Sequence, residues 1–430
     1  MKKKINVVTL GCSKNLVDSE LFLSQMVANG YEVSHDSADS DARIVAINTC
    51  GFILDAKEES VNTILEYAEA KKQGLIDKIF VFGCLSERYK DDLIAEIPEV
   101  DGFYGKFQVR KMVEDLKADY KMSLSRQRYL TTPSHYAYLK ISEGCNRTCS
   151  YCAIPRMTGA HQSVSIDDLL IEARGLAEKG VKELLVIAQD LSFYGIDLYK
   201  ESKLAQLVSE LSDIEGIEWI KLHYAYPANF PYDLLPVMYQ KPNVARYLDI
   251  ALQHCSDKML KLMRRNTTKA ETINLINRVR EEVPGVHLRT TILVGHPGET
   301  EEDFEELKSF VRQMRFERLG VFPYSHEEDT FAGEKYEDSI PPEVKQARAD
   351  EIMEIQQQIS AEINALKIGQ TMKVVIDRLE GDYFIGRTEF DSPEVDGEVL
   401  IAADQDLEIG GFYQVKITGS EDFDLYGKVK

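Results

Sequence analysis

Three cysteines stand at the ends of short apolar runs in the N-terminal part of the chain. The runs are INVVTLGC, ARIVAINTC and KIFVFGC, which end at Cys12, Cys50 and Cys84. An apolar or β-branched run followed by a helical pattern is typical of a βαβ unit. The predicted strands cover residues 5–10, 43–48 and 78–82, and the predicted helices cover residues 17–28, 56–71 and 87–96. We therefore expect a parallel sheet with helices on its faces.

The carboxyl ends of parallel strands meet at one edge of a sheet, so cysteines that follow such strands are brought together there. Gly11, Gly51 and Gly83 adjoin the three cysteines and allow a close approach of the backbone. The alternative is that these cysteines are buried small hydrophobic residues, as free cysteine often is. Cys255, in LQHCS, has no such partners, and packing is its favoured interpretation.

A longer alternation of strands and helices follows from about residue 135 to residue 366. Its six candidate strands are YAYLKIS, KELLVIA, GIEWIKLHY, RYLDIAL, VHLRTTILV and RLGVFPY. Six successive βα units predict an open or partial barrel with its reactive groups at the carboxyl ends of the strands. A long helix at about 342–366 closes this segment, with Pro341 and Pro342 at its start and Gly369 beyond its end.

The last segment consists of short strands separated by Gly, Asp and Pro turns, which is typical of a small β-barrel. A length of 430 residues is too great for one ordinary domain. The chain is thus predicted to be an α/β protein in three parts. The predicted boundaries are residues 1–118 for the N-terminal α/β domain, 119–134 for a linker, 135–366 for the partial barrel and 367–430 for the last domain.

The charge of the chain restricts its partners. With 51 Lys and Arg against 72 Asp and Glu, the formal charge is -21, which disfavours nonspecific binding to nucleic acid. Seven cysteines, an odd number in a long chain, do not suggest a disulfide framework. No apolar run has the length of a membrane span, so we expect a cytoplasmic protein. MKKKINVVTLGC also has the pattern of a lipoprotein signal, but a buried strand is its favoured interpretation.

A second set of cysteines lies within one loop, directly after the predicted strand YAYLKIS. EGCNRTCSYC contains Cys145, Cys149 and Cys152 as C-x3-C-x2-C, and this spacing lets one loop ligate three corners of a cubane iron–sulfur cluster. Three protein ligands leave one iron with an open position that can chelate a small molecule. The alternative is a zinc loop, although the paired C-x2-C form is absent and the next histidine is His161.

With Tyr151 before its last cysteine, this loop resembles the signature of the radical S-adenosylmethionine enzymes. The resemblance implies reductive cleavage of S-adenosylmethionine to a radical that abstracts hydrogen from an unactivated carbon. TILVGHPGET, with Gly295 at a strand end, resembles the strand of that superfamily that contacts the adenosine. Gln189 and Asp190 end another strand at the same mouth. Tyr151, Gln189 and Gly295 are therefore predicted to contact S-adenosylmethionine, with plain turn or strand-end roles as the alternative for the last two.

LGCSKNLVDSE, NTCGF and GCLSERY, upstream of this loop and of a small C-terminal barrel, resemble the methylthiotransferase family over essentially the whole chain. The resemblance implies an N-terminal methylthiotransferase domain, a radical S-adenosylmethionine barrel and a C-terminal TRAM domain. It also implies two 4Fe-4S clusters. The implied ligands are Cys145, Cys149 and Cys152 for the radical-generating cluster and Cys12, Cys50 and Cys84 for an auxiliary cluster that presents sulfur.

The resemblance further implies two molecules of S-adenosylmethionine per reaction. One supplies a methyl group to the cluster-bound sulfur, and the radical from the other removes the substrate hydrogen. An electron donor and a sulfur donor are implied as partners. General acid–base residues are not indicated: Asp190, His223 and Arg289 are placed at strand ends, where cofactor or packing contacts are equally compatible with their positions.

The family divides into members that methylthiolate adenosine in tRNA and a branch that modifies an aspartate of ribosomal protein S-twelve. Residues 367–430 contain 14 Asp and Glu but 7 Lys and Arg, whereas a tRNA-binding barrel needs cations for phosphates. An acidic barrel instead suits a basic ribosomal protein, although charged faces are often only solvated.

Sequence details also resemble the protein-modifying branch, notably LGCSKNLVDSE, QDLSFYG and FDSPEVDGEV; tRNA-modifying members typically read LGCQMN in place of the first. Thr158 and Asp329 depart from the Arg and Gly that are common at their positions. We therefore predict methylthiolation of the β-carbon of an aspartate in ribosomal protein S-twelve. The alternatives are tRNA adenosine methylthiolation and a noncatalytic zinc-binding RNA or ribosome adaptor.

Overall fold

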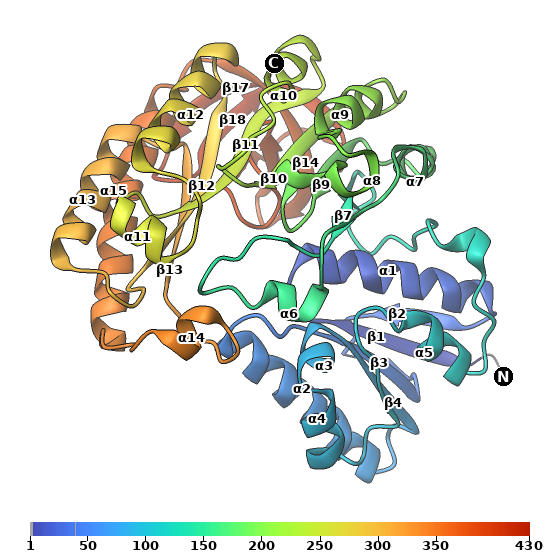
Figure 1. The fold of residues 1–430 in the computed structure, drawn as a ribbon. Coiled ribbons are helices and arrows are strands. Elements are labelled where there is room, and N and C mark those ends of the chain that lie inside the picture. Colours follow the sequence, from blue (N-terminus) through green and yellow to red (C-terminus); the bar gives the residue numbers. More distant parts are fainter. Residues whose placement is uncertain (1–2, 39) are drawn as a thin grey trace.

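The structure is a computed structural model that describes residues 3–38 and 40–430. Its N-terminal part, blue in Figure 1, is a five-stranded sheet in the order β2-β1-β3-β4-β5, with every neighbouring pair parallel. The strands are β1 (Lys4–Thr9), β2 (Glu32–His35), β3 (Ile44–Thr49), β4 (Lys78–Gly83) and β5 (Gly102–Phe103). The helices are α1 (Ser13–Ala28), α2 (Leu54–Lys72), α3 (Cys84–Arg88), α4 (Lys90–Glu96) and α5 (Val109–Asp115).

Helices cover both faces of this sheet, as expected for a parallel sheet. On one face Ile5 packs with Phe22 of α1 and Met112 of α5. On the other, Ile47 packs with Ile64 of α2 and with residues of α4. The predicted single helix over 87–96 is wrong in one respect. The chain leaves helical geometry at Tyr89 (φ -125°), and the first of the two resulting helices already begins at Cys84.

The central part is an all-parallel sheet of six strands in the order β13-β12-β11-β10-β9-β6, which confirms the predicted partial barrel. The strands are β6 (Tyr136–Lys140), β9 (Glu183–Ile187), β10 (Trp219–Ala225), β11 (Val244–Gln253), β12 (His287–Val294) and β13 (Arg318–Pro323). A separate two-stranded ribbon, β7 (Ser142–Glu143) and β8 (Gln162–Ser163), frames the cysteine loop and was not predicted.

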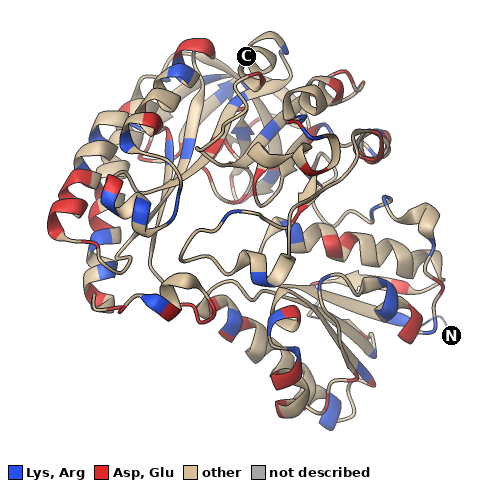
Figure 2. Cartoon of the chain, in the orientation of Figure 1, with Lys and Arg blue, Asp and Glu red and all other residues tan. Residues whose placement is uncertain are grey.

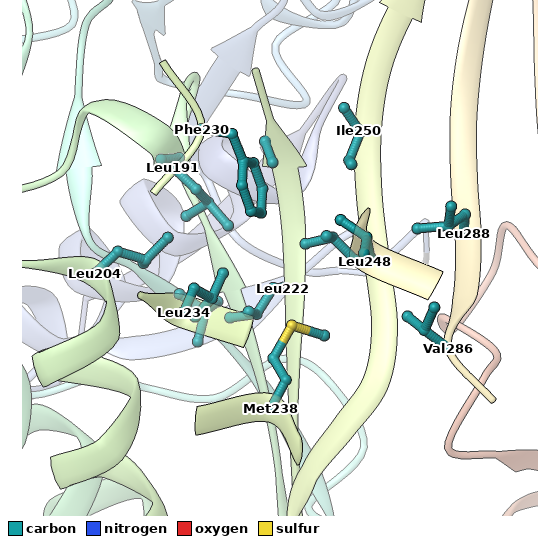
Figure 3. Close-up of a cluster of buried hydrophobic side chains, with 14 of the residues drawn as sticks. Leu191, Leu204, Leu222, Phe230, Leu234, Met238, Leu248, Ile250, Val286 and Leu288 are labelled. Atoms are coloured by element: carbon teal, nitrogen blue, oxygen red, sulfur yellow. The ribbon is translucent and has the colours of Figure 1, made fainter. Parts of the chain in front are cut away.

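The outer face of the central sheet is covered by helices that pack one apolar stripe inward. These helices are α7 (Ile166–Glu178), α9 (Leu204–Ser212), α10 (Leu234–Gln240), α12 (Lys269–Glu282), α13 (Glu301–Met314) and α15 (Pro342–Ala365). The shorter elements are η1 (Met122–Leu124), α6 (Ile154–Thr158), η2 (Leu191–Phe193), α8 (Ile196–Tyr199), α11 (Asp257–Leu262) and α14 (Phe331–Lys335). Figure 3 shows the core between the sheet and its helices, where Leu222, Leu248 and Leu288 from three adjacent strands meet Leu234 and Met238 of α10.

Helix α13 illustrates why these segments form amphipathic helices. Thr300 caps its first turn and forms a reciprocal capping box with Asp303. Phe304 and Leu307 are buried against the sheet, whereas Glu301, Glu302 and Glu305 are exposed; the acidic positions of the helix are red in Figure 2. Within the part of the chain that the structure describes, no helix has the length and apolar character of a membrane span.

The last part is a closed five-stranded barrel in the order β14-β15-β16-β18-β17, as predicted. Its strands are β14 (Thr371–Glu380), β15 (Tyr383–Thr388), β16 (Val399–Ala402), β17 (Phe412–Ser420) and β18 (Leu425–Val429). A buried ion-pair network joins it to the base of the central barrel. Glu183 of β9 pairs with Arg387 of β15 at 2.8 Å and with Lys221 of β10 at 2.7 Å. Arg318 of β13 pairs with Asp391 at 2.5 Å.

The concave face of the central sheet receives the first helix of the chain. Val17 of α1 packs against Tyr136 and Tyr138 of β6 and against Leu185 of β9. The N-terminal domain therefore lies across the opening of the barrel, and its strand ends are directed toward that opening (Figure 1).

The segment predicted as a linker is packed between these two domains. Arg128 is fully buried there and pairs with Glu20 of α1 and with Glu172 of α7, the latter at 3.2 Å. The segment 119–134 therefore fixes the N-terminal domain against the barrel.

Candidate functional site

The three dispersed cysteines follow three neighbouring strands, since β1, β3 and β4 are adjacent in the sheet. Cys12 is the N-cap residue of α1, Cys50 follows β3 directly, and Cys84 is the first residue of α3. Cys50 and Cys84 are buried, and Cys12 lies at the exposed rim. The sheet thus brings together the ends of the three apolar runs, as the strand pattern predicted.

Asn15 ties these strand ends to one another, although the sequence analysis did not single it out. Its side-chain Nδ2 donates to the carbonyl of Leu10 at 2.9 Å and to that of Thr49 at 3.2 Å. Its Oδ1 accepts from the Cys84 thiol at 3.7 Å. One amide therefore contacts the chain just before Cys12, just before Cys50 and at Cys84. The sequence signal for this role is an asparagine three positions after a cysteine. The structure shows that this asparagine is fully buried.

Glycine is required beside two of these cysteines. Gly11 has φ +89°, and a Cβ atom there would lie 2.7 Å from Cys50 Cβ and 2.9 Å from Cys50 Sγ. A Cβ atom at Gly51 would lie 2.9 Å from the backbone of Leu85. The backbone therefore approaches the cysteines more closely than any side chain would allow.

Positive charge is directed at this triad. Lys106 is buried, and its Nζ lies 3.9 Å from Cys84 Sγ. Neighbouring protein atoms desolvate the Cys12 sulfur, which raises its pKa, but Lys14, Lys106 and two backbone amides at the start of α1 bring the pKa below its usual value. Burial raises the pKa of Cys84 to about 12. A metal bound to such thiols displaces their protons.

The second triad lies in the loop between β7 and α6, at the mouth of the central barrel. Cys145 Sγ accepts from the backbone amide of Arg147 at 3.4 Å. Arg147 in turn pairs with Asp190, at the end of β9, at 2.7 Å. Gly144, with φ +81°, leaves no room for a side chain because a Cβ atom would lie 2.2 Å from the carbonyl oxygen of Ala160.

Arg265 contacts this loop and was not predicted as a site residue. Its guanidinium lies 3.5 Å from Cys149 Sγ and 3.3 Å from the Tyr151 hydroxyl. It also lies over the ring of Tyr226, 4.1 Å from the ring centroid. Because the arginine is buried, a negative charge on the loop sulfurs is stabilised by a cation that water does not screen.

The helix α3, which begins at Cys84, packs against the helix α6, which follows the loop triad. Cys84 packs directly against Ala153 and Met157, which belong to the segment that follows Cys152. The contact between α3 and α6 is visible at the junction of the blue and green parts in Figure 1. On the far side of the mouth, Glu327 pairs with Arg88 at 3.1 Å and fastens the N-terminal domain to the loop after β13.

The three residues predicted to contact S-adenosylmethionine have different surroundings. Tyr151 lies beside Arg265, as described. Gln189 donates to Glu143, and its Oε1 is a buried atom without a hydrogen-bond partner among the described residues. Gly295 has φ +73°, and a Cβ atom there would lie 2.3 Å from Lys345 Cγ, so packing against α15 already requires glycine. The contacts of these residues with a cofactor stay predictions.

The position of Arg289 differs from the predicted strand end. Arg289 is the third residue of β12, near its start and not at its carboxyl end, and it pairs with Asp249 at 3.4 Å and Asp396 at 3.3 Å. It belongs to the base of the barrel because it meets the C-terminal domain there.

Asp329 has φ +60°, a conformation that glycine adopts at lower cost. His223 and Cys255 are buried in the barrel.

All six predicted ligands are thiols, a soft donor set that suits iron–sulfur clusters. Three strand ends converge here, and the backbone at Gly11 approaches Cys50 closely. This arrangement fits a group that is held by all three thiols. Within residues 3–38 and 40–430, no three His, Cys, Asp or Glu side chains already form a metal-binding group. The ligand role of both triads is therefore proposed below from their placement and chemistry.

Comparison with known proteins agrees with this architecture. Residues 4–105 match an uncharacterized protein family, UPF0004, residues 139–311 match the radical SAM superfamily and residues 368–429 match the TRAM domain. Among solved structures, a radical S-adenosylmethionine methyltransferase, TsrM, from Kitasatospora setae has a TM-score of 0.57 at 13% identity, covering 77% of this chain and 74% of that chain. The cobalamin-dependent S-adenosylmethionine radical enzyme OxsB has a TM-score of 0.52 at 14% identity, covering 83% of this chain and 56% of that chain. These likenesses show the fold alone.

The fold and the family matches define a radical SAM enzyme with an N-terminal α/β domain and a C-terminal TRAM domain. Curated relatives named ribosomal protein uS12 methylthiotransferase RimO are 62% identical over 429 residues in Bacteroides thetaiotaomicron (100% of this chain, 98% of the relative) and 58% identical over 430 residues in Porphyromonas gingivalis (100% and 99%). The relative in Cytophaga hutchinsonii is 56% identical over 429 residues (100% and 98%). The chain belongs to this family of ribosomal protein uS12 methylthiotransferases, which confirms the predicted resemblance.

Proposed function

We propose that the protein is a radical S-adenosylmethionine methylthiotransferase that adds a methylthio group to the β-carbon of an aspartate in ribosomal protein uS12 (protein S-twelve). The observation that carries this proposal is the contact of Cys84 with Ala153 and Met157, directly after Cys152. A centre that supplies sulfur and a centre that activates the substrate must act on one carbon. The contact supports this because it sets the dispersed triad against the loop triad.

When bound, two 4Fe-4S clusters and S-adenosylmethionine supply the sulfur, the methyl group and the one-electron chemistry of the reaction. The loop triad would hold the radical-generating cluster, and the dispersed triad would hold the auxiliary cluster. The proposed ligands are Cys145, Cys149 and Cys152 for the former and Cys12, Cys50 and Cys84 for the latter.

The chain's own residues would orient these centres. Arg265 holds the loop through its contacts with Cys149 Sγ and the Tyr151 hydroxyl. Asn15 sets the spacing of the three strand ends. The unpartnered Oε1 of Gln189, held by the bond of its Nε2 to Glu143, is suited to accept a hydrogen bond from a bound molecule.

The reaction needs an electron donor and a source of sulfur, which are proposed as further partners. A substrate that belongs to the ribosome supports a cytoplasmic location. The acidic surface of the C-terminal domain supports a basic protein as the partner. No observation favours the tRNA or zinc-adaptor alternatives, since the relatives above are named for uS12.

Deletion of the gene, followed by mass spectrometry of uS12 and of tRNA nucleosides, tests the function. We expect loss of one methylthio group from an aspartate of uS12 and unchanged tRNA, with recovery on complementation. Cys12→Ala and Cys149→Ala should each fail to complement and should each lower the reconstituted iron content from about eight to about four atoms per chain. Cys255→Ala is the matched control and should retain both. Methylthiolation that is lost only from tRNA would overturn the proposal.

A further inference from the structure

Lys14 places a positive charge beside the dispersed triad, at the mouth of the barrel. It lies two residues after Cys12, at the start of α1, and its ammonium stands 3.8 Å from the centroid of the Tyr224 ring. Tyr224 is the penultimate residue of β10, so this contact spans the N-terminal domain and the mouth of the barrel. The site of contact is partly open to solvent, since both side chains are half-buried.

The charge of Lys14 lacks a carboxylate partner, in contrast with the two lysines nearby. Lys106 pairs with Asp18 at 3.1 Å, and Lys140 pairs with Glu143 at 2.8 Å. Within residues 3–38 and 40–430, no ion pair forms at Lys14, and the face of an aromatic ring is what receives its ammonium. A cation–π contact of this kind holds an ammonium in place without neutralising it.

The backbone of Tyr224 is strained in a way that presents its ring to Lys14. Its φ is +71°, a region that bulky residues rarely occupy. Asp249 of the neighbouring strand β11 is held by Arg289 at 3.4 Å. Strain of this kind persists only where the surroundings enforce it, and it is concentrated at ligand sites.

Two buried polar atoms beside Tyr224 are unpartnered within the described part of the chain. They are Nε2 of His223 and Oδ1 of Asp249, in residues that are 4% and 1% exposed. Burial is the main cause that lowers the pKa of His223, to about 3, so the ring is neutral and retains one N–H donor. The His223 ring can therefore donate a hydrogen bond to a bound molecule or to water.

A half-buried ammonium without an ion-pair partner, over a tyrosine ring that adjoins a neutral imidazole, is suited to a carboxylate, which gains a charge-assisted hydrogen bond there. A neutral purine offers no such partner for the ammonium. In an aspartate the β-carbon is bonded directly to the carboxylate carbon, so holding the carboxylate also positions the carbon that reacts.

We propose that Lys14 binds the side-chain carboxylate of the substrate aspartate at the barrel mouth and thereby selects an acidic over a neutral substrate side chain. The inference rests on the proposed function, because it names the group through which the substrate of that reaction is held. Tyr224 is the positioning residue that keeps the Lys14 ammonium directed at the opening.

A double-mutant cycle tests the contact. The binding of uS12, and of uS12 with the target aspartate changed to asparagine, is measured by anaerobic titration of the reconstituted enzyme and its Lys14→Met variant without S-adenosylmethionine. We expect each single change to weaken binding about tenfold, as for a partly buried ion pair, and the second change to add little to the first. Lys14→Arg should retain most of the discrimination. Lys78→Met, which removes an exposed charge at the opposite end of β4, is the control and should bind as wild type.

A second measurement separates substrate binding from a structural role. With wild type and Lys14→Met compared at matched iron content, KM for uS12 should rise about tenfold in the variant while kcat changes little, a split that a purely structural role would not produce. Tyr224→Phe, which keeps the ring, should behave as wild type, and Tyr224→Leu should raise KM several-fold.

The outcomes distinguish the inference from the function on which it rests. If the wild-type enzyme modifies no aspartate of uS12, the proposed function fails. If it does so and Lys14→Met binds both forms of uS12 as tightly as wild type, the inference alone is overturned. Loss of iron in Lys14→Met would instead assign the lysine to the auxiliary centre and would also overturn it.

Discussion

The ammonium of Lys106 lies 3.6 Å from the carboxylate of Glu143. This pair joins the N-terminal domain to the strand that leads into the cysteine loop. Lys106 also lies 3.9 Å from Cys84 Sγ, within the dispersed triad. Asp18 and Lys140 complete the group. Each of its two carboxylates forms an ion pair with each of its two ammonium groups. The two positive and two negative charges balance within a buried site. The group therefore holds the two triads at a fixed separation.

Replacement of Lys106 by methionine tests how strongly this group holds the domains. The change leaves two largely buried carboxylates with Lys140 as their one remaining cation, and we expect a loss of about 3–5 kcal/mol in the free energy of unfolding. Urea denaturation of the metal-free protein measures it. Lys111→Met, an exposed change in α5, is the control, for which we expect less than about 0.5 kcal/mol. Equal stability of the two variants would contradict the role of the pair.

The space beside Cys50 predicts a selective effect of Gly11→Ala. Gly11 and Gly30 have similar positive φ values, +89° and +81°, but a Cβ atom at Gly30 meets nothing within 4 Å. Both alanine variants should lose about 1 kcal/mol from backbone strain. Gly11→Ala alone should lose about four irons per chain on reconstitution. Retention of full iron content in Gly11→Ala would show that the crowding at Cys50 is relieved by movement of the loop.

The buried arginine of the connecting segment predicts a large effect where the sequence indicated a linker. Arg128→Met leaves Glu20 and Glu172 buried without their shared partner, and we expect a loss of about 3–5 kcal/mol. Arg126→Met provides a close control, because Arg126 is one-third exposed and lies 3.9 Å from the same Glu172. Its loss should be about 0–1 kcal/mol. Thermal and urea unfolding of the two variants decide between a packed segment and a simple connection.

The base of the barrel predicts a defined pH dependence of stability. Burial by itself raises the pKa of Glu183, but Arg387 and Lys221 bring it down to about 2 from an ordinary value of 4.5. Burial lowers the pKa of Lys221, so the permanently charged Arg387 is the partner that secures the carboxylate. Because the folded-state pKa is depressed, the stabilisation is complete above about pH 4.5 and is lost as the pH falls toward 2.

The stabilisation from Glu183 amounts to roughly 3 kcal/mol. Urea unfolding at pH 7, 4 and 3 measures it. Glu183→Gln should be less stable than wild type at pH 7 and should show a smaller further loss on acidification. Glu215→Gln, an exposed change in the same domain, should follow the wild-type curve. Parallel curves for wild type and Glu183→Gln would refute the assignment.

Much of the fold was predictable because each strand of the two parallel sheets is a short apolar run followed by a helical pattern. The predicted runs before Cys12, Cys50 and Cys84 are strands in the structure, and their adjacency follows from the parallel arrangement. The predicted methylthiotransferase class is confirmed by the family to which the chain belongs. The roles of the individual site residues stay predictions.

What the sequence did not indicate depends on contacts between distant segments. Arg265 lies far along the chain from Cys149 yet contacts it, and Arg128 occupies a stretch without apolar periodicity. Periodicity detects residues that bury one face of an element, whereas these arginines are buried by pairing with groups from other elements. Arg289 was misplaced for a related reason, since its position within β12 was inferred before the strand bounds were known.

The pairing of Arg387 with Glu183 has a consequence for recombination between related chains. A chimera that takes its last barrel from a protein without this arginine leaves Glu183 of β9 buried with Lys221 as its one remaining ion-pair partner. Modular exchange at this boundary is therefore restricted to donors that carry both partners. The TRAM barrel and the floor of the catalytic barrel must be inherited together.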